Sequence, residues 1–202
     1  MTSVLEQLVA EVEAALADPA LTTDRARAEA MAPAMARLIA APDPIPAWAE
    51  EPFEGGAVGN LVHADPEGRF HVLVVVFPEG TSSGVHFHGC WGVIGYLRGG
   101  DEETRYVERD GVPVEADRRA WQEGGIAYLL PDEGAASVAE RSGCWHRVRN
   151  PGPGTGVSVH VLCRTPAMHP HQYWDRSTDR VLEFPFVEVA PDRWVAQVTG
   201  LT

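Results

Sequence analysis

The sequence predicts a mainly β protein, a β-sandwich or jelly-roll barrel, with a small layer of helices at its N-terminus. Apolar residues at helical spacing within the first forty residues predict the helices. Many short β-branched segments from Gly56 onward predict the barrel, and the chain's 20 glycines and 16 prolines suit the tight turns between them. With 202 residues, 45% of them hydrophobic, the chain is long enough for one core and one domain.

The first helix is expected over residues 2–17, where Leu5, Leu8, Val12 and Leu16 form an apolar stripe. A second helix is expected over residues 23–39, with a kink or break at Pro33 because proline cannot donate the helical hydrogen bond. A proline-rich extended connector follows. We therefore assign residues 1–52 to helices and a connector packed on the barrel, and residues 53–202 to the barrel itself, within a single structural domain.

The strand pattern begins with the segment Phe70–Phe77, which is β-branched and almost continuously apolar, as is typical of a strand buried on both faces. Glycine, proline or acidic clusters separate most of the later segments. The strands predicted in this way are residues 70–77, 91–97, 105–108, 126–130, 138–140, 145–149, 156–162, 181–183 and 194–198.

Composition narrows the class of function. The formal net charge of −13 argues against nucleic acid and against an anionic membrane surface as partners. The first residues do not resemble a signal peptide, and no apolar run reaches the roughly 18 residues of a membrane-spanning helix. Three cysteines with no CxxC spacing predict free thiols in a reducing compartment. We expect a cytoplasmic protein, a monomer or a small homo-oligomer.

Three histidines form the main chemical pattern of the chain. His86 and His88 are spaced i, i+2 on an extended segment, so their side chains point to the same face of a sheet. His146 lies on a later predicted strand and can meet them across a small barrel. Three neutral imidazoles that converge in this way bind a transition-metal ion and leave coordination positions open for a substrate and O2.

These residues resemble the two sequence motifs of the cupin superfamily. The first motif, G-x5-H-x-H-x3–4-E-x6-G, is matched by Gly80, His86, His88 and Gly99, with Gly92 at the glutamate position. The second motif, G-x5-P-x-G-x2-H-x3-N, is matched by Gly143, His146 and Asn150, with Arg141 at the proline position and Gly134 one residue out of place. The resemblance implies a cupin jelly-roll barrel that holds its metal through histidines 86, 88 and 146.

Within the cupins, the chain is similar to the thiol dioxygenases, the group of cysteine dioxygenase and bacterial 3-mercaptopropionate dioxygenase. The similarity lies in residues 86–99, 146–150 and 157–160, within a matching region of roughly residues 56–166. It implies one Fe(II) per chain, O2 as second substrate, and oxidation of a small thiol to a sulfinic acid. It also implies that Ser158 and His160 occupy the first two positions of the family's Ser-His-Tyr relay beside the iron.

The chain departs from this family at two positions. Leu162 stands where the relay tyrosine is expected, and Gly59 stands where cysteine dioxygenase has its carboxylate-binding arginine, so cysteine is not the expected substrate. A substrate carboxylate would need another cation, for which Arg164 and Arg98 are the candidates. Leu162 and Trp91 complete the candidate substrate-binding residues, and the tyrosines considered as replacements for the missing phenol are Tyr96, Tyr128 and Tyr173.

The sequence therefore predicts a non-haem Fe(II) thiol dioxygenase that acts on a small, acidic thiol. Two alternatives remain open. One is a three-histidine iron cupin that oxygenates a chelating substrate other than a thiol. The other is a non-redox metal cupin, either an isomerase or a small-ligand binding protein.

Overall fold

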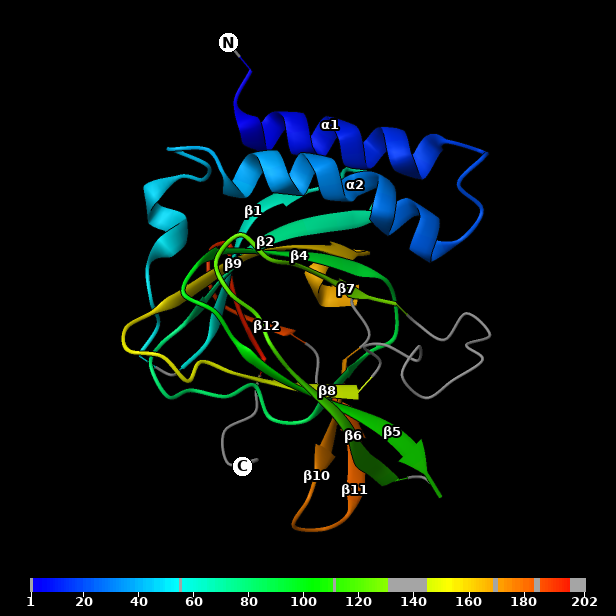
Figure 1. Cartoon of the computed structure of the whole chain (residues 1–202), viewed down its shortest axis with the longest axis vertical. Helices are drawn as coiled ribbons and strands as arrows, with labels where there is room; N and C mark the ends of the chain where they lie inside the picture. Colours follow the sequence, from blue (N-terminus) through cyan, green and yellow to red (C-terminus); the bar gives the residue numbers. More distant parts are fainter. Residues whose placement is uncertain are drawn as a thin grey trace.

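The computed structural model of the chain describes residues 2–54, 56–110, 112–130, 145–168, 171–183 and 186–196. Two helices, α1 (Val4–Ala17) and α2 (Asp24–Ile39), lie side by side on one face of a β structure (Figure 1). Short 3-10 helices occupy Ala47–Glu50 and Pro166–Met168. The strands form two antiparallel sheets with a cavity between them, so the fold is mainly β, a jelly-roll barrel with a small N-terminal helical layer.

The larger sheet lies under the helices. Its described strands run in the order β12 (Phe186–Ala190), β13 (Arg193–Ala196), β1 (Val58–Ala64), β2 (Phe70–Phe77), β9 (Gly156–Cys163), β4 (Gly92–Arg98) and β7 (Ile126–Leu129). The smaller sheet runs in the order β11 (Arg180–Glu183), β10 (His171–Asp175), β3 (His86–His88), β8 (Trp145–Arg149), β5 (Glu102–Arg109) and β6 (Val112–Ala120).

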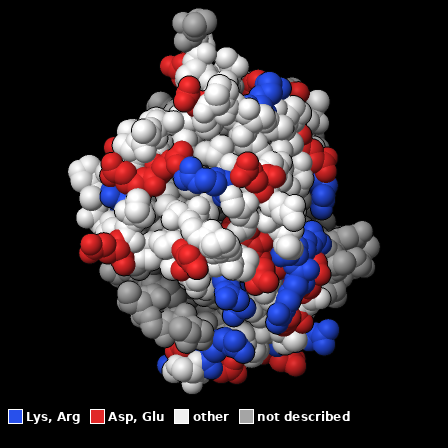
Figure 2. Space-filling view, turned by 60° about the vertical axis from the view of Figure 1, so that its left-hand side comes forward, with Lys and Arg blue, Asp and Glu red and all other residues white. Residues whose placement is uncertain are grey.

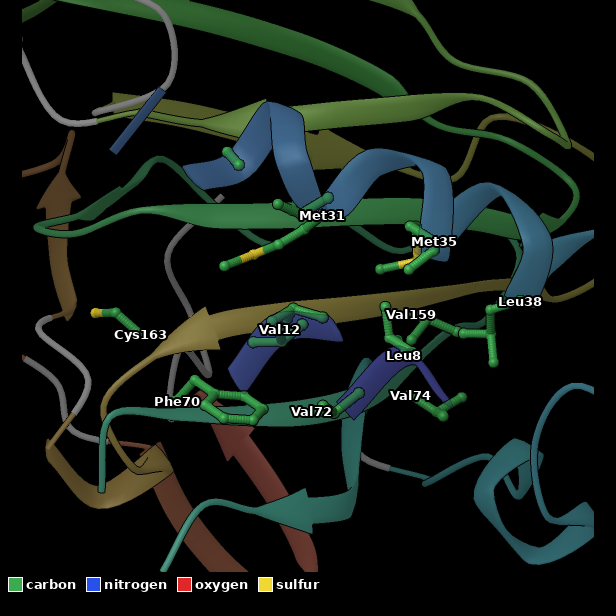
Figure 3. Packing of buried hydrophobic residues seen from close by; sticks show 14 of the residues in the cluster. Leu8, Val12, Met31, Met35, Leu38, Phe70, Val72, Val74, Val159 and Cys163 are labelled. Atoms are coloured by element: carbon green, nitrogen blue, oxygen red, sulfur yellow. The ribbon is translucent and has the colours of Figure 1, made fainter. Parts of the chain in front are cut away.

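The helices pack against the outer face of the larger sheet. Both begin with side-chain caps, Ser3 in a capping box with Glu6 for α1, and Thr23 for α2. Figure 3 shows the side chains of Met31 and Met35 from α2 among the apolar residues of the shared core. Gly95 on β4 allows this close approach, since a Cβ there would lie 2.6 Å from Met35 Sδ.

Strand β2 is buried on both faces, which explains its continuous apolar sequence. Val72, Val74 and Val76 belong to the core shared with the helices, whereas Leu73 and Val75 line the cavity between the sheets. The helical layer and the cavity therefore lie on opposite sides of the same sheet.

One expectation from the sequence was wrong, and the break that was one of the two possibilities at Pro33 does not occur. Helix α2 continues through Pro33 to Ile39 without a break, and Met35 and Leu38 bury its second half in the core. Cys90 and Cys163 are not free thiols but a disulfide, with Cα atoms 6.1 Å apart. The two cysteines meet because the turn before β4 lies beside the end of β9, where the Cys163 amide donates a hydrogen bond to the Trp91 carbonyl. Cys144 lies outside the described residues.

The predicted strands recur with shifted ends. Phe70–Phe77 and Trp145–Arg149 have the predicted bounds, and β5 begins three residues before its prediction. Strands β1, β6, β10 and β12 were not predicted; in β6, which ends the smaller sheet, charged residues interrupt the apolar pattern. The prediction for residues 138–140 falls outside the described residues.

The charged side chains lie largely on the surface. The face drawn in Figure 2 carries acidic side chains over its upper part and a group of basic ones toward its lower right. Several arginines are ion-paired, among them Arg118 with Glu115 and Arg119 with Asp117. No helix in the described part of the chain is long and apolar enough to cross a membrane.

Candidate metal centre and cavity

The three predicted histidines come together on the inner face of the smaller sheet. Strands β3 and β8 are antiparallel neighbours in which His86 lies opposite His146, and the i, i+2 spacing places His88 on the same face as His86. His86 Nε2 lies 2.9 Å from His88 Nε2 and 3.0 Å from His146 Nε2. All three side chains are buried. They form a group of the size that holds a metal ion.

Hydrogen bonds fix the orientation of two of these rings. Nδ1 of His146 lies 2.9 Å from Glu103 Oε1, and Nδ1 of His86 lies 3.2 Å from the Gly84 carbonyl oxygen. An ionised carboxylate and a carbonyl only accept hydrogen bonds, so each Nδ1 is the donor, and Nε2 of a neutral ring carries a lone pair. These lone pairs face the shared centre, which is the arrangement that a divalent transition metal requires. The residues present therefore fit a metal ion.

Glu103 on β5 is a site residue that the sequence did not indicate. Its second oxygen, Oε2, accepts hydrogen bonds from Arg105 Nη2 at 3.0 Å and from Trp121 Nε1 at 2.9 Å. Burial alone raises the pKa of Glu103, but the hydrogen bond from His146, the charge of Arg105 and the hydrogen bond from Trp121 outweigh it and hold the pKa below its usual value. Glu103 is therefore an anion that positions His146.

The metal centre opens into a cavity of about 470 Å³ between the two sheets. The larger sheet supplies mostly apolar walls, including Leu73, Val75, Ile94 and Trp194. The polar side chains in the described lining are Thr81, Ser82, Ser83, His86, His88, Tyr96, Asp101, His146, His160 and Tyr173. No lysine or arginine is among the described lining residues.

The predicted relay residues lie on one face of β9. Ser158 Oγ is 2.8 Å from His160 Nε2, and His160 lines the cavity. Leu162, two residues further along the same face, also lines the cavity at the place where the family has its tyrosine. The structure thus brings Ser158, His160 and Leu162 together as alternation along a strand requires.

Two tyrosines reach the cavity from other strands. Tyr173 on β10 pairs with His86 in the sheet, and the two ring centroids are 5.6 Å apart. Tyr96 on β4 pairs with Ser158 and stacks on Trp121. Burial raises the pKa of both phenols above the usual value, so both stay protonated at neutral pH. Tyr128 lies instead among the residues packed against the helical core.

The other candidate substrate residues lie away from the described cavity lining. Arg98 is about half exposed and pairs with Glu50 at 2.6 Å. Arg164 is exposed, and its backbone carbonyl, rather than its side chain, contacts His71. Trp91 is buried in the core beneath the helices. Of the four candidates, only Leu162 lines the described cavity.

Asp101 is a second residue that the sequence did not indicate. It directly precedes β5, is only 6% exposed and lines the cavity. Burial, and after it the charge of Glu103, raises the pKa of Asp101 to about 7. The register of β5 against β8, which brings the Glu103 side chain to His146, was the information needed to find Glu103.

No protein-family model matches the chain. It is similar to a solved double-stranded β-helix protein from Klebsiella pneumoniae, with 19% identity, a TM-score of 0.42 and coverage of 60% of this chain and 81% of that one. A cupin domain from Bordetella pertussis has 19% identity, a TM-score of 0.38 and coverage of 55% and 95%. Oxalate decarboxylase from Bacillus subtilis, studied for its Mn(II) centres, has 19% identity, a TM-score of 0.35 and coverage of 46% and 21%. All three similarities are weak.

Proposed function

We propose that the protein is a non-haem iron thiol dioxygenase, which converts a small thiol to its sulfinic acid with O2. The observation that carries the proposal is the convergence of Nε2 atoms from His86, His88 and His146 at the wall of a cavity of about 470 Å³. Neutral ligands leave a divalent cation with its full charge, which favours binding of an anionic thiolate. The sequence similarity to the thiol dioxygenases supports the same reaction.

The reaction balances as RSH plus O2 giving RSO2H, with both oxygen atoms transferred to sulfur. Sulfur loses four electrons and the two oxygen atoms gain them. When bound, Fe(II) supplies a centre that lowers the thiol's pKa and a path for electrons from sulfur to O2.

The chain's own residues orient the reactants. Glu103 holds the ring of His146 through Nδ1, which keeps Nε2 directed at the centre. The Ser158–His160 pair presents a polar group within the largely apolar wall that the larger sheet supplies to the cavity. Tyr173, beside His86, supplies a protonated phenol in a different place from the family's tyrosine. The apolar walls limit water around the reacting groups.

The expectation that the substrate is an acid has little support in the cavity lining. Arg98 and Arg164 were the cations proposed to bind a substrate carboxylate, and both lie outside the described cavity lining. A thiol and O2 therefore remain the proposed substrates, and these two arginines give no support to a carboxylate on the thiol.

Oxygen consumption tests the proposal directly. Protein loaded anaerobically with Fe(II) is offered 3-mercaptopropionate, mercaptosuccinate, cysteine and 2-aminoethanethiol, and the products are identified by mass spectrometry. We expect one thiol to give a sulfinic acid with one O2 consumed per molecule. His86→Ala abolishes this activity, whereas His63→Gln, on β1 and outside the described lining, retains it.

Two results would count against the proposal. Iron-loaded protein that consumes no O2 with any thiol refutes the reaction. Protein purified without added metal that contains predominantly zinc, manganese or nickel, and shows no O2 reactivity, favours the non-redox cupin instead.

A further inference from the structure

An indole N–H in the cavity wall has no acceptor among the described residues. Trp194 on β13 lines the cavity, and its Nε1 atom is buried but makes no hydrogen bond within the described part of the chain. The other buried side-chain atoms without a hydrogen-bond partner there belong to residues outside the described lining, among them Asn60, His63 and Arg193. Trp194 therefore combines an unsatisfied donor with a place in the cavity wall.

Trp194 is held in this wall by its neighbours. Its backbone pairs with Gly59 of β1 on one side and with Glu188 of β12 on the other. Its side chain packs against the apolar cluster that includes Leu73. Gly59 also lines the cavity and adds no side chain to the wall beside Trp194. Strand pairing and apolar packing thus position the indole without a hydrogen bond from its N–H to any described residue.

A buried N–H without an acceptor is unfavourable. A donor that is removed from water and gains no acceptor carries the full cost of desolvation. A ligand that brings an oxygen to Nε1 removes this cost in the complex, whereas a methyl group of similar size does not. Because the indole nitrogen is a donor only, the matching group on the ligand is an acceptor.

The acceptor is expected to be uncharged. The described lining contains no lysine or arginine, and it contains the acidic residue Asp101. A carboxylate that enters this cavity loses its hydration, and one neutral N–H does not compensate for that loss. A carbonyl oxygen of a ketone, ester or amide costs less to remove from water and accepts the same hydrogen bond.

The metal centre and Trp194 belong to different sheets. The three histidines lie on the smaller sheet, and β13 with Trp194 is part of the larger one. A molecule that touches both therefore spans the cavity, whose volume of about 470 Å³ lies within the range of sites for whole small molecules. Leu73, Val75 and Ile94 line the larger sheet's wall, so the rest of the molecule is expected to be apolar.

We propose that the cavity selects thiols that carry an uncharged carbonyl group at the end remote from sulfur, and that Trp194 Nε1 donates a hydrogen bond to that carbonyl oxygen. This inference rests on the proposed function, because it takes the three histidines as the place where sulfur binds. It adds Trp194 as a specificity-determining residue and replaces the expected acidic thiol by an uncharged one.

Binding calorimetry under anaerobic conditions tests the inference with three thiols of nearly the same shape. 4-Mercaptobutan-2-one carries the carbonyl oxygen, 3-methylbutane-1-thiol has a methyl group in its place, and 3-mercaptopropionate is the corresponding anion. We expect the Fe(II)-loaded wild type to bind 4-mercaptobutan-2-one most tightly of the three.

Trp194→Phe keeps an aromatic ring in the wall and removes the donor. The ratio of the affinity for 4-mercaptobutan-2-one to that for 3-methylbutane-1-thiol should therefore fall about threefold to tenfold, as expected for one neutral hydrogen bond. Any loss of packing lowers both affinities and leaves this ratio unchanged. Trp48→Phe is the matched control, because Trp48 is 43% exposed and lies outside the described lining, and it should leave all three affinities unchanged.

A second measurement uses the wild-type sequence. In the Zn(II)-loaded protein, which is diamagnetic, the proton resonance of the Trp194 indole N–H should move downfield when 4-mercaptobutan-2-one binds, because a hydrogen bond deshields the proton. Binding of 3-methylbutane-1-thiol should produce no such downfield shift, since this thiol has no acceptor at its remote end.

Three outcomes overturn the inference. The first is an equal loss of affinity for both uncharged thiols in Trp194→Phe, and the second is a Trp194 N–H resonance that 4-mercaptobutan-2-one does not move downfield. The third is tighter binding of 3-mercaptopropionate than of 4-mercaptobutan-2-one by the wild type. Failure of the proposed function is recognised separately, as absence of O2 uptake with every thiol, 4-mercaptobutan-2-one included, while calorimetry still reports which thiol binds.

Discussion

Glu103→Gln is the substitution that most directly tests how the metal centre is built. Glutamine has nearly the same shape as glutamate and can still accept a hydrogen bond from His146 Nδ1, but it carries no charge. The substitution therefore leaves the packing in place and removes the anion that faces His146 and Arg105.

Two effects of different size follow. Loss of a carboxylate that orients a ligating histidine weakens metal binding by about tenfold to a hundredfold. In addition, Arg105, whose side chain is 7% exposed, keeps its charge without its described carboxylate partner. Removing one member of a buried ion pair costs about 3–5 kcal/mol, so the metal-free variant should lose this much free energy of unfolding.

The neighbouring residue provides a matched control. The Glu102 side chain is 55% exposed, and its Oε2 lies 3.7 Å from Nη1 of Arg149, which is also half exposed. Glu102→Gln should therefore lower the free energy of unfolding by less than about 1 kcal/mol. Metal affinity is measured by competition with a chelator, and stability by urea unfolding of the metal-free proteins. If Glu103→Gln binds metal within twofold of Glu102→Gln, the assignment of Glu103 as the positioning residue of His146 is wrong.

Three further predictions concern the acid, the phenol and the disulfide. The pKa of Asp101 is raised in the folded state from 3.8 to about 7, so folding stability should fall as pH rises through this window. Asp101→Asn lacks this fall and should gain up to about 4 kcal/mol on the wild type between pH 4 and pH 8, as read from urea unfolding. Tyr173→Phe should lower the rate of O2 consumption about tenfold or more with unchanged iron content, and an unchanged rate would remove the phenol from the mechanism. The Cys90–Cys163 disulfide spans a sequence separation of 73 residues, so Cys163→Ser should cost about 4 kcal/mol under oxidising conditions and almost nothing beyond wild type under reducing ones.

The elements that the sequence predicted well are those whose signal is local. Phe70–Phe77 has an apolar side chain on both faces, and both of its faces are buried. His86 and His88 share a face because of their i, i+2 spacing alone. His146 was recognised from a short motif in its own segment, together with Gly143 and Asn150. The N-terminal helices also follow from their own caps and apolar stripes.

The features that were missed depend on which strands lie side by side. Glu103 is one of many acidic residues until β5 is placed next to β8, with Thr104 opposite Arg147 and Arg105 opposite His146. The pairing of Cys90 with Cys163 likewise requires β4 to lie beside β9. Strand alternation gives the face that a residue occupies, but the register between distant strands is set by packing of the whole barrel.

Gly92, at the glutamate position of the cupin motif, and Leu162, at the position of the relay tyrosine, belong to one packing arrangement. They lie opposite each other in strands β4 and β9. A Cβ atom at position 92 would be 2.7 Å from Leu162 Cδ2 and 3.1 Å from Leu129 Cδ1. A side chain at position 92 therefore requires the end of the Leu162 side chain to shift.

The cupin motif that the sequence resembles has a glutamate at the position of Gly92, and in this chain a negative charge lies elsewhere near the centre. Glu103 is an anion on the opposite sheet from Gly92, and it reaches the centre through the hydrogen bond to His146 Nδ1. A carboxylate that is hydrogen-bonded to a ligating histidine raises the basicity of that histidine but occupies no coordination position. The position therefore stays open to substrate or O2. An aliphatic wall at Leu162 and a carboxylate behind His146 together favour a centre in which the substrate, rather than the protein, supplies the anionic ligand.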